Sequence, residues 1–75
     1  MASVKAAVQA KERVREILKG LPGIKGIGIT WDDNGRPCVQ VNVGYEIEDA
    51  SRERIPSQIE GIPVLIEFTG QIQTE

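Results

Sequence analysis

The residue types that most often carry enzyme chemistry are scarce in this chain. Histidine is absent, and Cys38 is the only cysteine among the 75 residues. A cysteine nucleophile needs a neighbouring base or cation, and Arg36 is the only nearby candidate. One cysteine without histidine also supplies too few ligands for a zinc or iron–sulfur site. We therefore expect no catalytic residue, no metal and no cofactor, and we expect that the protein is not an enzyme.

The acidic stretch at 32–35 has two chemical interpretations. Asp32-Asp33-Asn34-Gly35 resembles the start of a calcium-binding loop. A complete loop places a glutamate at its twelfth position, where this chain has Val43. Asn-Gly is also a favoured pair in tight hairpin turns, because both residues tolerate positive φ angles. The stretch is therefore predicted to join two antiparallel strands, with Cys38 as a small, outward-facing residue of the second strand.

Three glycines, Gly23, Gly26 and Gly28, form the other pattern that could bind a ligand. A phosphate-binding glycine loop follows a strand and opens a helix. Here the glycines follow a helical pattern and enter a strand, so no phosphate loop is predicted. A glycine inside a strand indicates close approach of another backbone or of a ligand. The alternative is that this face simply meets water, and the sequence leaves both interpretations open.

The first element predicted to position these cysteine, acidic and glycine residues is a helix at about 3–20. Apolar residues at helical spacing form its buried stripe: Val4, Ala7, Ala10, Val14, Ile17, Leu18 and Leu21. Gly20 and Pro22 end the helix, since proline cannot continue it and glycine tolerates the left-handed closing conformation.

Alternating apolar residues predict three strands, at about 24–31, 38–45 and 62–69. A short crossover at 46–61 joins the last two strands, and Pro56 is predicted to start a single helical turn through Glu60. The whole chain, 1–75, is predicted to be a single small α+β domain. Its N-terminal helix packs on a three-stranded, mainly antiparallel sheet, and the tail at 71–75 extends the last strand or frays.

Strand periodicity divides the sheet into two faces. Apolar and aromatic residues share the inward parity: Ile27, Ile29, Trp31, Val39, Val41, Val43, Tyr45, Val64, Ile66 and Phe68. One helix covers only one face of such a sheet, so the other face is predicted to be open, flat and poor in side chains. The residues predicted to form an interaction surface there are Gly26, Gly28, Thr30, Gln40, Asn42, Leu65 and Glu67.

Size and charge narrow the class of partner. A chain of 75 residues buries a small core and has no disulfide, which favours oligomerisation. Residues 1–31 carry six basic and two acidic residues, whereas 32–75 carry three basic and nine acidic residues. The basic helix either meets an acidic partner or lies over the acidic loops of its own chain, and charge runs of this size favour the second interpretation.

Nucleic-acid and membrane binding are not predicted. The open face has no aromatic residue on which a base could stack, and the sequence pI is about 5.1. No apolar run approaches the roughly 20 residues that span a bilayer, and the N-terminal segment lacks the apolar core of a signal peptide. With its lone cysteine, the protein is expected in the cytoplasm.

Four segments together resemble a known pattern: Leu21-Pro-Gly-Ile-Lys-Gly-Ile-Gly-Ile29, Val39-Gln-Val-Asn-Val43, Ile55-Pro-Ser-Gln-Ile-Glu-Gly-Ile-Pro-Val64 and Thr69-Gly-Gln-Ile72. They are similar to a small uncharacterised bacterial domain, found alone or ahead of trypsin-like serine protease domains. The resemblance covers residues 14–75. Its matching positions are turn and core residues, so it carries over no catalytic residue.

The function expected from these observations is that of a non-catalytic interaction or assembly module. Its open, glycine-rich face would pack against a protein partner or a second copy of the chain, with a homodimer as the simplest case. The alternative is a small-molecule sensor or carrier domain, with a metabolite held between the open face and the crossover.

Overall fold

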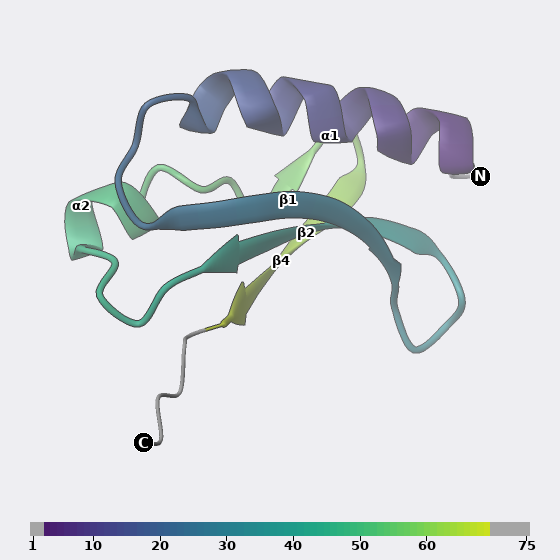
Figure 1. Cartoon of the computed structure of the whole chain (residues 1–75). Coiled ribbons are helices and arrows are strands. Elements are labelled where there is room, and N and C mark those ends of the chain that lie inside the picture. Colours follow the sequence, from purple (N-terminus) through teal and green to yellow (C-terminus); the bar gives the residue numbers. More distant parts are fainter. Residues whose placement is uncertain (1–2, 70–75) are drawn as a thin grey trace.

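The computed structural model describes residues 3–69, in the order α1, β1, β2, α2, β3, β4 (Figure 1). α1 is the helix Val4–Leu18. At its start the Ser3 hydroxyl accepts a hydrogen bond from the Ala6 N–H at 3.1 Å, which satisfies a donor that has no partner within the helix. Beyond its end Gly20 has a φ of 83°, typical of a helix C-terminus. The predicted N-terminal helix is confirmed, slightly shorter than expected.

The first two strands form the predicted hairpin. β1, Ile24–Trp31, pairs antiparallel with β2, Pro37–Val43. At the turn, the Asp32 N–H donates to the Arg36 carbonyl at 2.9 Å, and Gly35 has a φ of 79°. The residues from Asp32 to Gly35 therefore connect two antiparallel strands, as predicted. Only Gly35 has a positive φ angle, however, so the expectation that Asn34 also adopts one is wrong.

The second half of the sheet differs from the prediction. After the short helix α2, Asp49–Arg52, the chain forms β3, Gln58–Ile59, and β4, Ile62–Phe68. The sheet has four strands in the order β1-β2-β4-β3, and β4 runs parallel to β2 but antiparallel to β3. The α+β class with one long helix on the sheet is confirmed. The sheet is mixed, with one strand more than predicted.

The helical turn predicted from Pro56 to Glu60 is wrong. This segment forms β3 and then a tight turn, in which Glu60 has a φ of 52° and Gly61 a φ of 82°. Two successive positive φ angles are typical of a type I′ hairpin turn. Pairing of Ile59 with Ile62 adds a cross-strand apolar contact, whereas an isolated helical turn of this length has little stability of its own.

The core lies between α1 and the apolar face of the sheet. Ala7, Ala10 and Val14 of α1 are completely buried in one cluster with the valines of β2. Ile55 from the crossover joins the same cluster, so the crossover covers the same side of the sheet as α1 (Figure 1). The predicted inward parity is confirmed for Ile27, Ile29, Val39, Val41, Val43 and Val64, which all belong to this cluster or pack against it.

Burial decreases toward the ends of this apolar face. Val4 and Ile17 of the predicted stripe are exposed, because they lie on the flanks of α1 and not on its central line. Trp31 and the last inward residues of β4, Ile66 and Phe68, are also exposed, since a helix of 15 residues covers only part of the sheet. The inward parity of these residues therefore did not make them core residues.

β2 ends earlier than predicted, at Val43. The Gly44 N–H donates to the Gly23 carbonyl at 2.9 Å, and the chain then turns away from the sheet. Tyr45 consequently lies outside the strand with 66% of its surface exposed, and its ring stacks on Phe68 at a centroid distance of 5.6 Å. The predicted strand extension to residue 45 is thus wrong, and the tail at 71–75 lies outside the described residues.

No helix within residues 3–69 has the length and apolar character needed to cross a membrane.

Candidate interaction surface

The face of the sheet opposite α1 carries all seven residues predicted to form an interaction surface, and we call it the open face. β1 supplies Gly26, Gly28 and Thr30, β2 supplies Gln40 and Asn42, and β4 supplies Leu65 and Glu67. The register pairs Gly28 with Gln40 and Gln40 with Leu65. A second row joins Gly26, Asn42 and Glu67 in the same way. Since paired residues point to the same face, the structure brings the predicted residues into one surface.

The open face is polar in its middle and apolar on β4. The Gln40 Nε2 donates to the Asn42 Oδ1 at 2.8 Å, so the two side-chain amides are hydrogen-bonded to each other. Leu65 beside them is 41% exposed. α1 lies on the other side of the sheet, and the crossover residues Ile47, Ile55 and Ile59 pack into the core on that side (Figure 1).

Gly28 has no structural reason within the chain to be glycine. A Cβ added there would meet no atom within 4 Å, and its φ is not in the left-handed region. A Cβ at Gly26 would make only an ordinary contact with the Asn42 Nδ2, at 3.7 Å. Glycine weakens a strand relative to a residue with a side chain, so its presence at these positions is costly without an external contact.

Gly23, by contrast, has a clear structural cause. It has a φ of 91° and lies against Ile47, where a Cβ would come within 2.9 Å of the isoleucine side chain. The fold therefore explains the glycine at 23, whereas it does not explain those at 26 and 28. A Cβ at Gly44 would meet only the carboxylate end of the exposed Glu46 side chain, so this glycine is not required in the same way.

Cys38 has the predicted outward parity but is completely buried. Its Sγ donates to the Arg36 carbonyl at 3.5 Å, and it pairs with Thr30 at the hairpin end of the open face. Burial raises the pKa of the Cys38 thiol, and the negative charge of Asp32 raises it further. The nucleophilic thiolate is therefore disfavoured at this position.

The Asp32 carboxylate is held by its own turn. One oxygen accepts from the backbone N–H groups of Asn34 at 2.8 Å and Arg36 at 2.9 Å, and the other accepts from the Arg36 Nε at 3.0 Å. The backbone hydrogen bond from Arg36 is the main reason that the pKa of Asp32 is lowered. Within residues 3–69, no three His, Cys, Asp or Glu side chains gather closely enough to hold a metal ion.

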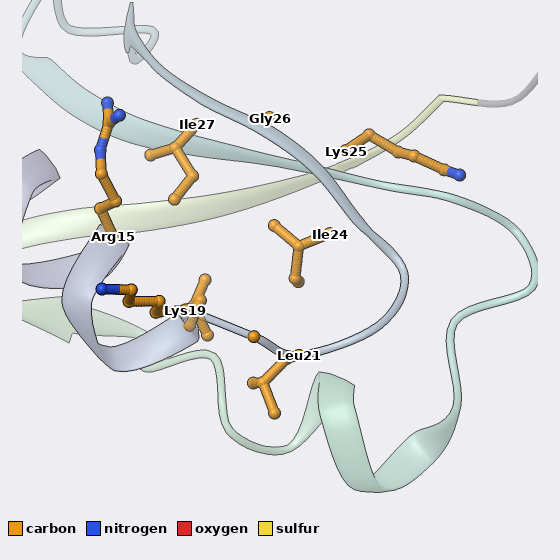
Figure 2. A pocket seen from close by; sticks show the side chains of 9 residues that line it. Arg15, Lys19, Leu21, Ile24, Lys25, Gly26 and Ile27 are labelled. Atoms are coloured by element: carbon orange, nitrogen blue, oxygen red, sulfur yellow. The ribbon is translucent and has the colours of Figure 1, made fainter.

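The cleft expected between the open face and the crossover is not built by these elements, because the crossover packs on the opposite face. A cavity of about 320 Å³ lies instead between the last turn of α1 and the start of β1 (Figure 2). Its lining includes Arg15, Lys19, Leu21, Ile24 and Ile27. Sequence reasoning missed this site, although the basic residues 11, 15 and 19 recur at a spacing of four along the helix.

Comparison with known proteins adds no relative from which a site could be transferred. No protein-family model matches the chain, and neither curated proteins nor solved structures give a significant match. The candidate surface is therefore argued from the geometry of this chain alone.

Proposed function

We propose that the protein is a non-catalytic interaction module whose open face packs against another protein chain, most simply a second copy of itself. The observation that carries the proposal is the unexplained glycine at 28, on a face without a covering element in the described chain. A partner backbone lying against this face would account for the missing side chain. The resemblance to a small bacterial domain agrees with a role that needs no catalytic residue, and the lone cysteine agrees with the cytoplasm.

The shape of the open face favours a protein over a small molecule. Ligand pockets are concave and bury most of their ligand, whereas the open face is one side of three adjacent strands, and its two glycines have no side chain that could wall a pocket. An exposed leucine beside two amide side chains is the mixture of apolar and polar groups common in protein interfaces. The sensor alternative has less support, since the crossover does not wall this face.

The test is Gly28→Thr, which places a β-branched side chain in the open space on this face. The fold should persist, because the new Cβ meets no atom of the chain within 4 Å and threonine suits a strand. Self-association, measured by sedimentation velocity over a concentration series, should weaken at least several-fold, because the side chain would collide with the partner. Circular dichroism checks the fold.

Ser57→Thr is the control, since it places the same threonine side chain at an exposed position away from the open face. If the wild-type chain is monomeric at high micromolar concentration, self-association is excluded, and co-purification from the native host then tests a different partner. Association of Gly28→Thr equal to that of wild type would contradict the proposal.

A further inference from the structure

The outer edge of β1 is a second surface, distinct from the open face. β1 is the first strand of the sheet, so only its inner edge pairs with another strand of the described chain. The Asp32 N–H points toward β2, where it donates to Arg36. Because backbone groups alternate along a strand, those of Ile27, Ile29 and Trp31 point to the outer edge. Three consecutive outward positions can therefore pair with an added strand.

One flank of α1 runs along this edge. Val4, Val8, Lys11, Arg15 and Lys19 recur at the spacing of a single helix flank. Arg15 and Lys19 line the cavity together with Ile24 and Ile27 of β1, which places this flank on the β1 side. Figure 2 shows the Arg15 and Lys19 side chains on the helix beside β1. On the opposite flank, Arg13 forms an ion pair with Glu60 at 3.3 Å, at the other end of the sheet.

The β1 edge and this flank of α1, which together we call the groove, have an apolar end and a basic end, and the cavity lies at the basic end. Val4 and Val8 are 51% and 43% exposed at the start of the helix. Farther along, Arg15 has only a weak, exposed pair with Glu12 at 3.7 Å, and β1 has no carboxylate of its own. Positive charge therefore dominates the end of the groove near Ile27.

Lys25 does not add to the basic end of the groove. It lies in a bulge of β1 and belongs to the cavity lining, but Figure 2 shows its side chain extending away from Arg15 and Lys19. It pairs instead with Glu46 at 2.9 Å, and this hydrogen bond lowers the pKa of the Glu46 carboxyl.

We propose that this groove binds an extended, acidic segment of a partner protein, which adds a strand to the β1 edge. Residues of the segment opposite Ile27, Ile29 and Trp31 would point toward the α1 flank. An acidic side chain opposite Ile27 meets Arg15 and Lys19, and the backbone pairs with the outward groups of β1. The inference goes beyond the proposed function, since it uses the edge of the sheet and not the open face.

An acidic segment fits this groove better than a second copy of the chain. β1 has no carboxylate, so the β1 edge of another copy would bring no negative charge to Arg15 and Lys19. An acidic segment supplies the carboxylates that these basic side chains can bind. Charge complementarity therefore favours an acidic segment as the occupant.

The experiment titrates the isotope-labelled protein with the synthetic peptide acetyl-Glu-Val-Glu-Val-Glu-Val-Glu-amide and follows the backbone amide signals by NMR. The signals of Ile27, Ile29 and Trp31 should shift and become protected from hydrogen exchange. The matched peptide with lysine in place of glutamate should bind much more weakly. Equal binding of the two peptides, or shifts confined to the open face, would overturn the proposal.

Charge variants test the basic end. The double variant Arg15→Gln/Lys19→Gln should weaken the peptide affinity about threefold to tenfold, as expected for two exposed ion pairs. Lys5→Gln/Arg13→Gln removes the same charge from other parts of α1 and should change the affinity less than about twofold. Equal effects of the two double variants would show a non-specific charge interaction and overturn the proposal.

Backbone pairing is tested on both molecules. Trp31→Pro removes an outward N–H at an exposed position and should abolish binding, with Trp31→Ala as the control for the lost side chain. Two N-methylated peptides test the same pairing without any change to the protein. In one peptide the odd-numbered residues are methylated, and in the other the even-numbered residues. Only the peptide whose methyl groups replace the N–H groups that face β1 should lose binding. If both bind as the unmodified peptide does, strand addition is wrong. Gly28→Thr changes the open face and not the β1 edge, so it should leave peptide binding intact. This variant therefore distinguishes a failure of the groove proposal from a failure of the proposal for the open face.

Discussion

Asp32 and Cys38 lie close together at the hairpin, and both are held by it. Asp32 uses both carboxylate oxygens to bind backbone and side-chain groups of its own turn. The Cys38 thiol is buried and donates to a backbone carbonyl two residues away. The hairpin therefore occupies both side chains with its own hydrogen bonds: Asp32, which the sequence suggested as a calcium ligand, and Cys38, which it suggested as a nucleophile.

Asp32→Asn is expected to destabilise the fold at neutral pH. The pKa of Asp32 is lower in the folded chain than in the unfolded chain, where an aspartate has a pKa of about 3.9. The ionised carboxylate therefore stabilises the fold at pH values above about 3.9. This contribution is lost as the pH falls through the folded-state pKa. Urea unfolding is measured at neutral pH and at several pH values below about 4. The difference in free energy of unfolding between wild type and variant should become smaller as the pH falls.

Asp33→Asn is the control for this prediction, because Asp33 makes none of the three hydrogen bonds that hold Asp32. It should change stability little at any of these pH values. A gap for Asp32→Asn that stays constant with pH would contradict the assignment of the effect to the ionised carboxylate.

At the scale of the elements, two glycines in open space have different roles. Neither Gly28 in β1 nor Gly61 in the β3–β4 turn would bring a Cβ within 4 Å of another atom. Gly61 has a φ of 82°, whereas the φ of Gly28 is not in the left-handed region. Neither position needs glycine for lack of space, and only Gly61 needs it for its backbone conformation.

Gly61→Ala is expected to lower the free energy of unfolding by about 1 kcal/mol, because an L-residue is strained at this φ. Gly28→Ala should be neutral or stabilise by up to about 1 kcal/mol, since alanine restricts the unfolded chain and meets no clash. Urea unfolding of the two variants at a concentration where the chain is monomeric measures the difference. Similar losses for both would mean that Gly28 also has a structural role within the chain.

At the scale of the whole molecule, the core is narrow and is closed by a single helix. Its central positions on α1 are small residues, Ala7, Ala10 and Val14, which are completely buried. Val8 lies on the flank of the same helix and is 43% exposed. A substitution on the buried side of α1 should therefore reduce the stability of the domain much more than the same substitution on its exposed flank.

Val14→Ala is expected to destabilise by about 1–2 kcal/mol through loss of buried methyl groups. Val8→Ala makes the same chemical change in the same helix, and its small burial loss is offset by the better helix propensity of alanine, so the change should stay under about 0.5 kcal/mol. Chemical denaturation of both variants provides the comparison. Equal losses would mean that the β1-side flank of α1 is covered in solution.

The sequence by itself determined the features that depend on local periodicity and turn chemistry. Apolar spacing located α1, alternation assigned Ile27 and Val41 to the core side, and Asn34-Gly35 marked the first hairpin. The same alternation placed Gly28 on the open face. These features follow from backbone geometry within a few residues, so they can be derived before the fold is known.

Only the tertiary structure decided which strands pair and which side chains are covered. β4 pairs parallel with β2, and β3 forms at Gln58–Ile59, because partner choice depends on contacts between residues far apart in the chain. Trp31 has inward parity and yet is exposed, since burial depends on the reach of α1 across the sheet. The groove between Arg15 and Ile27 arises from the same docking of helix on sheet, which periodicity within either element does not encode.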